Sequence, residues 1–192
     1  MDKWIDFLTP FFSNRDNARE FIEPLEALQL EDPSHPAKIM LHQTQRLISI
    51  SDDLTVIRKG KESLQLAFLL ICAENIAKMH DNFHDEGSCR AYVRRFFEQF
   101  VLDEDRHVLE VSFTTHDLKP LDLRAIVDAL YAVRCDVVHE GKYWGFQFND
   151  GKTPILNVDP DVIVSITLGQ FRDIIIKGCI RAINTYPGRA AP

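Results

Sequence analysis

The feature that most constrains this chain is a stretch that becomes apolar on nearly every side when it is wound into a helix. It runs from about Lys61 to His80, and its middle, Leu66 to Ala73, reads LAFLLICA. A helix with apolar side chains around its whole circumference has to be covered on all sides, because an open face would expose hydrocarbon to water. We therefore expect this helix at the centre of a helical bundle.

Most of the remaining chain shows the spacing of apolar side chains that predicts amphipathic helices. Helices are expected at residues 2–8, after a cap at Ser13 or Asn14, after a cap at Ser34, around Tyr92 to Phe100, from Pro120 to about Gly141, and from about Val162 to Asn184. Pro24 falls inside the second of these helices and is expected to kink or divide it, because proline has no N–H to donate.

Strand signals are few. Residues 107–113 alternate loosely and predict a short strand. Two further runs flank Asn149-Asp150-Gly151, a strong turn signal, and predict a small β-hairpin over residues 143–158. We therefore predict an all-α, up-and-down helical bundle in a single domain over residues 1–192, with this hairpin and a frayed tail at 186–192.

The composition narrows the class of protein. The net charge of -7 and the pI near 5.5 argue against a broadly basic nucleic-acid or membrane surface, although a local basic cleft is compatible with both. No run approaches the roughly 20 apolar residues of a membrane span, so we predict a cytoplasmic protein with no membrane partner. The four cysteines form no Cys-x-x-Cys pair and predict reduced, mostly buried thiols.

The chemistry-bearing segment is Arg134-Cys135-Asp136-Val137-Val138-His139, at the end of the helix that begins near Pro120. Helical phase places Arg134 inside the apolar stripe of that helix. A guanidinium stays charged at any working pH, and burying one without a partner is very costly. Arg134 must therefore meet a carboxylate, a group of backbone carbonyls, a neighbouring subunit or a bound anion.

His139 follows five residues later and points away from Arg134 if the helix stays regular. Gly141 is placed to end the helix in a left-handed cap, which leaves His139 in the last turn beside unpaired carbonyls that favour imidazolium. The two side chains then converge within one chain, or they meet their counterparts across a symmetric dimer. A purely structural interpretation stays open, in which Arg134 pairs with Glu74 or another buried acid and His139 only caps the helix.

The segment LDLRAIVDALYAVRCDVVHEG resembles the signature helix of the HEPN superfamily, in which an Arg is followed by four to six residues and a His. Tyr131 before the Arg and Gly141 after the His fit this pattern. The stretch LLICAENIAKM resembles the central helix of the family, with Glu74 as its acidic residue. The resemblance covers residues 61–145 and implies a HEPN-type all-α bundle that needs no cofactor.

The resemblance also implies a function, because many proteins of this superfamily are metal-independent endoribonucleases that act as homodimers through the motif helix. Arg134 would then hold the scissile phosphate of RNA, His139 would serve as general base or acid, and Asp136 would be their polar helper. The supporting residues are Glu74, Glu140 and Tyr143. The resemblance also implies a toxin or defence role, with an antitoxin protein as partner, or a non-catalytic RNA- or protein-binding module in which Arg134 forms a structural ion pair.

Two other clusters contain side chains that could bind a ligand. His80 and His84 share a helix face and would suit a zinc ion, but Gly87 indicates that the helix is ending there, which favours a solvated polar end and no metal. A second cluster interleaves arginines with aromatic residues between Arg90 and Arg106. It would suit an RNA track, although the same spacing is typical of an amphipathic helix with its aromatic side chains in the core.

Overall fold

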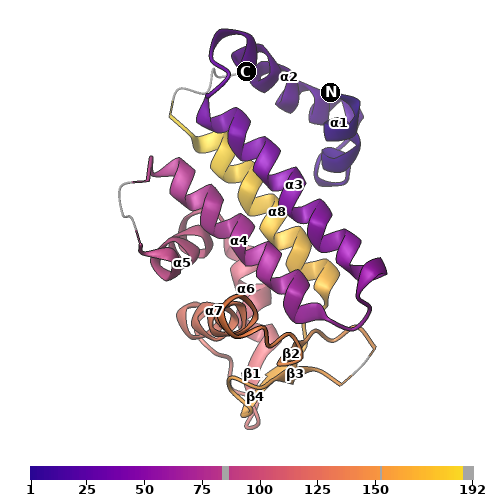
Figure 1. Ribbon diagram of the computed structural model, residues 1–192, viewed down its shortest axis with the longest axis vertical. Helices are drawn as coiled ribbons and strands as arrows, with labels where there is room; N and C mark the ends of the chain where they lie inside the picture. The colour runs from indigo at the N-terminus through magenta and orange to yellow at the C-terminus, as the bar shows by residue number, and fades with distance from the viewer. Residues whose placement is uncertain (84–86, 152, 188–192) are drawn as a thin grey trace.

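The computed structural model describes residues 1–83, 87–151 and 153–187. The described chain is mostly helical, which confirms the predicted class at this level. Three long helices lie side by side through the middle of the molecule: α3 (Pro36–Ile57), α4 (Glu62–His80) and α8 (Leu168–Thr185) (Figure 1). The chain reverses between α3 and α4 through a short loop, so these two helices run antiparallel.

The central position predicted for the apolar stretch is confirmed. α4 contacts α3 and α8, and it also contacts α5 (Cys89–Gln99) and α7 (Leu123–Glu140). Its side chains are buried on every face between Leu66 and Ala77, apart from the half-buried Phe68, Ile71 and Asn75. The neighbouring helices cover the apolar side chains of α4 on all sides, and they also bury Glu74.

The N-terminal helices pack on one end of α3. α1 (Asp2–Leu8) and the 3₁₀ turn η1 (Thr9–Phe11) lead to α2 (Arg15–Glu31), which Asn14 caps by accepting a hydrogen bond from the N–H of Asn17 at 2.8 Å. α2 is one helix through Pro24, so the proline does not divide it. Ser34 does not cap α3, because its own N–H and hydroxyl donate to Asp32 and the helix begins at Pro36.

The prediction of a strand at 107–113 was wrong for every residue except Phe113. Residues up to Ser112 belong to α6 (Asp103–Ser112), and only Phe113 enters a strand, β1 (Phe113–Thr115). Three acidic residues in the first turn of α6 favour the helix, because carboxylates stabilise the positive end of the helix dipole. Pro120 likewise lies before α7, in a bridge to Thr114, and the helix begins at Leu123 after the cap Asp122.

Two small antiparallel sheets close the end of the molecule beyond α7. β2 (Phe146–Gln147) pairs with β3 (Ile155–Leu156), which confirms the predicted hairpin, and β1 pairs with β4 (Val162–Val164). The segment between β2 and β3 is longer than a tight turn and is tied to α8, whose first N–H donates to Asp150. The last helix therefore begins at Leu168 and not near Val162, since the β-branched residues 162–164 extend the sheet.

The C-terminal tail was predicted to fray from residue 186. Tyr186 is packed edge-on against the rings of His35 and His80, and its hydroxyl donates to Asn82 at 3.2 Å. Residues 188–192 lie outside the described part of the chain.

Candidate active site at the end of α7

The end of α7 has the geometry expected from its glycine. Gly141 adopts a left-handed conformation with φ of 65°, and the N–H groups of Gly141 and Lys142 both donate to the carbonyl of Asp136. Bonds of this kind satisfy a carbonyl that the ending helix leaves without a partner. The helix thus stops at Glu140 and leaves His139 in its last turn.

Arg134 has the carboxylate partner that its position in the apolar stripe demanded. Its Nη2 donates to Oε2 of Glu74 at 3.1 Å, and the two side chains are only 13% and 6% exposed. The Nε of Arg134 is also buried, and it has no hydrogen-bond partner among the described residues. The guanidinium is therefore fixed by one bond while part of its donor capacity is unused.

Glu74 serves a second cation. Lys78, one turn further along α4, donates from Nζ to Oε1 of Glu74 at 2.5 Å and also lies 3.3 Å from the thiol of Cys89. Burial alone would lower the pKa of Lys78, but its bonds to Glu74 and Cys89 outweigh that effect and raise it. One carboxylate thus faces two cations, so the cluster of Glu74, Lys78 and Arg134 has a net positive charge.

Tyr131 adds an aromatic face to this cluster. The guanidinium carbons of Arg134 and Arg90 lie 5.4 and 5.2 Å from the centre of its ring. Burial raises the pKa of the Tyr131 hydroxyl, so the phenol stays neutral at physiological pH. Sequence analysis did not identify Lys78 or Arg90 as members of the site. Lys78 follows Glu74 by four residues on one helix, a spacing that does indicate contact, whereas the approach of Arg90 from α5 has no local signal.

The remaining predicted site residues lie further out. His139, Glu140 and Tyr143 are exposed, and Asp136 is half-buried. Glu140 forms an ion pair with Lys142, and this hydrogen bond lowers the pKa of the Glu140 carboxyl. Within the described chain, no hydrogen bond or ion pair joins His139 to Arg134. The structure thus brings Arg134 together with Glu74, and it leaves His139 on the outside of the same helix end.

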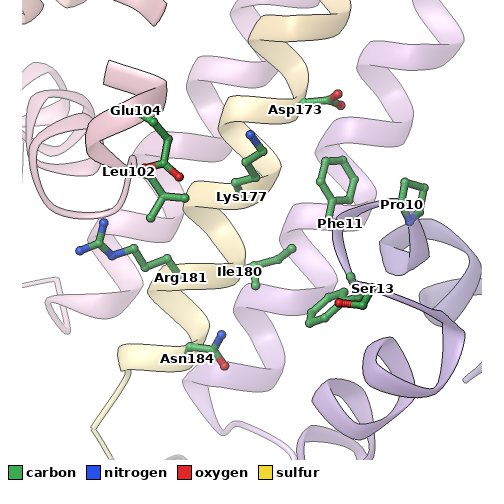
Figure 2. Close-up of a pocket in the computed structure, with 11 residues that line it drawn as sticks. Pro10, Phe11, Ser13, Leu102, Glu104, Asp173, Lys177, Ile180, Arg181 and Asn184 are labelled. Carbon is green, nitrogen blue, oxygen red and sulfur yellow. The ribbon is translucent and has the colours of Figure 1, made fainter. Parts of the chain in front are cut away.

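A hollow of about 640 Å³ lies elsewhere, along the exposed face of α8. Figure 2 shows Lys177 and Arg181 extending from α8, with Leu102 and Glu104 on one side and Phe11 and Ser13 on the other. Lys177 is held by Asp105 at 2.9 Å. None of the six predicted site residues lines this hollow, so its volume gives no support to the motif site.

Neither alternative cluster gains support from the described residues. The ring of His80 packs against Phe100 and Tyr186, burial lowers the pKa of its imidazole, and His84 lies outside the described residues. No group of three or more His, Cys, Asp or Glu side chains suited to a metal occurs in the part of the chain that the structure describes.

The alternative of an RNA track of arginines and aromatic residues is not supported. Arg94 forms a bidentate pair with Asp128, and Arg95 forms an ion pair with Asp81. The aromatic side chains Tyr92, Phe96 and Phe97 are buried in the core. The interpretation of α5 as an ordinary amphipathic helix is the one that the structure supports.

Comparisons with protein-family models, curated proteins and solved structures found no match to this chain. Among the described helices, none combines the length and the apolar character that crossing a membrane requires.

Proposed function

We propose that this protein is a HEPN-type, metal-independent endoribonuclease that acts as a homodimer through α7. The observation that carries the proposal is the set of contacts around the guanidinium of Arg134. Glu74 holds it in place, its Nε has no partner among the described residues, and Lys78 makes the surroundings positive. A fixed cation beside a second cation is suited to a phosphate group.

The chemistry follows from the two motif residues. His139 would take the proton of an RNA 2'-hydroxyl, and that oxygen would attack the adjacent phosphorus while Arg134 stabilises the charge on the phosphate oxygens. The bond to the 5'-oxygen of the next nucleotide breaks, and that oxygen receives a proton from an imidazolium. The products are a 2',3'-cyclic phosphate and a 5'-hydroxyl, and Asp136 would orient the imidazole.

A symmetric dimer supplies what one chain lacks. His139 is exposed and is not bonded to Arg134 of its own chain, and its neighbour Val138 is 48% exposed. If two α7 helices lie side by side about a two-fold axis, each His139 approaches the motif of the partner. Two imidazoles at one site would also provide the base and the acid that the reaction needs. A cytoplasmic location, a toxin or defence role and an antitoxin partner belong to the same proposal.

One observation favours a second candidate function. Glu74 already neutralises Arg134, which is the arrangement expected if the arginine only joins α7 to α4. The protein would then be a non-catalytic HEPN-like module that binds RNA or a protein through its surface. This candidate requires no contact between Arg134 and a ligand.

The deciding experiment is an RNA cleavage assay in excess chelator. We expect the purified protein to produce 2',3'-cyclic phosphate ends, and we expect His139→Ala and Arg134→Lys to reduce cleavage by at least about a hundredfold. Arg124→Ala is the matched control, because Arg124 is an exposed arginine on the same helix. If both motif variants cleave RNA as fast as the wild type, the nuclease proposal is ruled out. If the folded wild-type protein cleaves no RNA at all, the binding module is supported.

A further inference from the structure

Two aromatic side chains are exposed just beyond the motif. Trp144 is 58% exposed and Tyr143 is 40% exposed, and their rings meet edge to face with centres 5.5 Å apart. The other tryptophan of the chain, Trp4, is 7% exposed and is stacked on His42. We call Tyr143 and Trp144 the aromatic patch. Adjacent exposed apolar side chains can mark an interaction site, whereas single ones are normal on any surface.

Positive charge adjoins the aromatic patch. Nζ of Lys61 lies 5.5 Å from the centre of the Tyr143 ring. Arg58 and Lys59 precede Lys61 in the loop between α3 and α4, and none of the three forms an ion pair with a described residue. In a chain with a net charge of -7, this loop is a local basic surface beside exposed rings. Rings and cations together suit a polyanion that carries planar groups.

The segment that carries the patch is anchored. The hydroxyl of Ser63 donates to the carbonyl of Phe146 at 3.2 Å and accepts from its N–H at 3.0 Å. The N–H of Asn157 donates to the carbonyl of Gly145 at 2.8 Å. These bonds join the segment to the start of α4 and to the region of β3, so the backbone directly after the rings is fixed before a ligand arrives. Less conformational entropy is then lost on binding.

The patch is also close to the proposed catalytic histidine. Trp144 lies five positions after His139, and a chain of that length spans at most about 18 Å when fully extended. The left-handed turn at Gly141 shortens this distance. A strand of a few nucleotides that lies on the patch can therefore reach His139.

We propose that the aromatic patch stacks unpaired bases of single-stranded RNA, with Lys61 neutralising the adjoining phosphate. The inference rests on the proposed ribonuclease function and adds the class of substrate. Unpaired bases are favoured over a duplex because bases inside a helix are already stacked on each other and cannot cover a protein ring. Because Arg58, Lys59 and Lys61 form no ion pair with a described residue, they favour an anionic strand over a second copy of this acidic chain.

Tryptophan fluorescence tests the inference without cleavage. The probe is a single-stranded deoxyoligonucleotide of about ten thymidines, which offers bases and phosphates but lacks the 2'-hydroxyl that the proposed reaction needs. We expect the probe to quench the emission of Trp144 in the wild type. Affinities of the variants are measured by the anisotropy of a fluorescently labelled probe, because Trp144→Ala removes the quenched side chain, and Trp144→Ala should weaken binding between about fivefold and about a hundredfold. We expect Lys61→Gln to weaken binding several-fold and to reduce its dependence on salt.

Phe83 provides a matched control. It is 57% exposed, nearly the same as Trp144, and it lies just beyond the opposite end of α4 from Lys61. Phe83→Ala should leave the affinity for the probe unchanged. A duplex of the same length should bind more weakly than the single strand.

The outcomes separate the two proposals. Quenching and a loss of affinity in Trp144→Ala support the aromatic patch even if the protein cleaves no RNA, in which case only the nuclease proposal fails. RNA cleavage together with an unchanged affinity in Trp144→Ala overturns the aromatic patch and leaves the nuclease. A blue shift of Trp144 emission that grows with protein concentration and is not reversed by the probe also overturns it, because a second copy then covers the rings.

Discussion

Arg134 and Glu74 join the motif helix to the centre of the molecule. Nη2 of Arg134 on α7 donates to Oε2 of Glu74 on α4 at 3.1 Å, although the two residues are 60 positions apart in the chain. Both side chains are largely buried, and Lys78 binds the other oxygen of the same carboxylate. Among the described residues, Glu74 is therefore the one acid that pairs with both of these cations, and stability should depend on it strongly.

The first prediction concerns the loss of that acid. Glu74→Ala should lower the free energy of unfolding by about 3–5 kcal/mol, because removing one partner of a buried pair leaves the other charge uncompensated. Urea unfolding measures the effect. The double variant Glu74→Gln/Arg134→Met should lose less free energy of unfolding than the single variants Glu74→Gln and Arg134→Met lose together. Glu20→Gln, on an exposed side chain of α2, is the control and should change stability by less than about 0.5 kcal/mol.

The second prediction concerns the contact between α8 and α5. A Cβ added at Gly178 would lie 2.6 Å from Cζ of Phe96, a ring that is fully buried against Phe97 and Phe100. Gly178→Ala should therefore cost about 1–3 kcal/mol through overpacking. Gly169 lies in the same helix with no atom within 4 Å of a built Cβ, so Gly169→Ala should keep or slightly raise the melting temperature. Equal melting temperatures for the two variants would contradict this account.

The third prediction concerns the turn after the motif. Gly141 has a φ of 65° and open space around its Cβ position, so the penalty for a side chain there is purely conformational. Gly141→Ala should cost about 1–2 kcal/mol, and Gly141→Asn should cost less because asparagine tolerates this conformation better. Thermal unfolding measures both. Gly145→Ala is the comparison and should be nearly neutral, since its Cβ would meet Asn157 at an ordinary 3.7 Å.

The fourth prediction concerns acid. Burial lowers the pKa of His42 and of His80 below the ordinary value of 6.5. The folded protein thus keeps both imidazoles neutral, while the unfolded chain binds protons below about pH 6.5. Their contribution to stability is complete above that pH and is lost as the pH falls toward the folded pKa values.

Urea midpoints between pH 7.5 and 4.5 check this prediction. His42→Phe keeps a ring against Trp4 but cannot titrate, so its stability should fall less steeply with acid than that of the wild type. Asp128 contributes to the pH dependence of stability in a different pH range. Its hydrogen bond to Arg94 lowers the pKa of its carboxyl below 3.8, and this contribution is lost only under more acidic conditions. An identical slope in His42→Phe would show that His42 takes no part.

Several features of the fold followed from local patterns. The apolar circumference of residues 66–73 required a central helix, Asn14 capped α2 as expected, and Gly141 ended α7 where the spacing indicated. Each of these depends on forces that act within a few residues: helical periodicity, capping hydrogen bonds and the freedom of glycine to adopt positive φ. The boundaries near β1 and β4 were wrong because strand pairing between residues 113–115 and 162–164 is a long-range interaction.

The sequence alone therefore determined that Arg134 needs a partner, since its charge and its place in an apolar stripe are local facts. The sequence also named Glu74 as one possible partner. Only the tertiary structure decided between Glu74 and the other acids and added Lys78 and Arg90 to the cluster, because contacts between helices depend on how α4, α5 and α7 are packed. The same packing neutralised Arg94 and Arg95 and left Trp144 exposed beside Lys61 and Tyr143. Charge and aromatic content can be read from a chain, but whether a group is paired or free is decided by its neighbours in space.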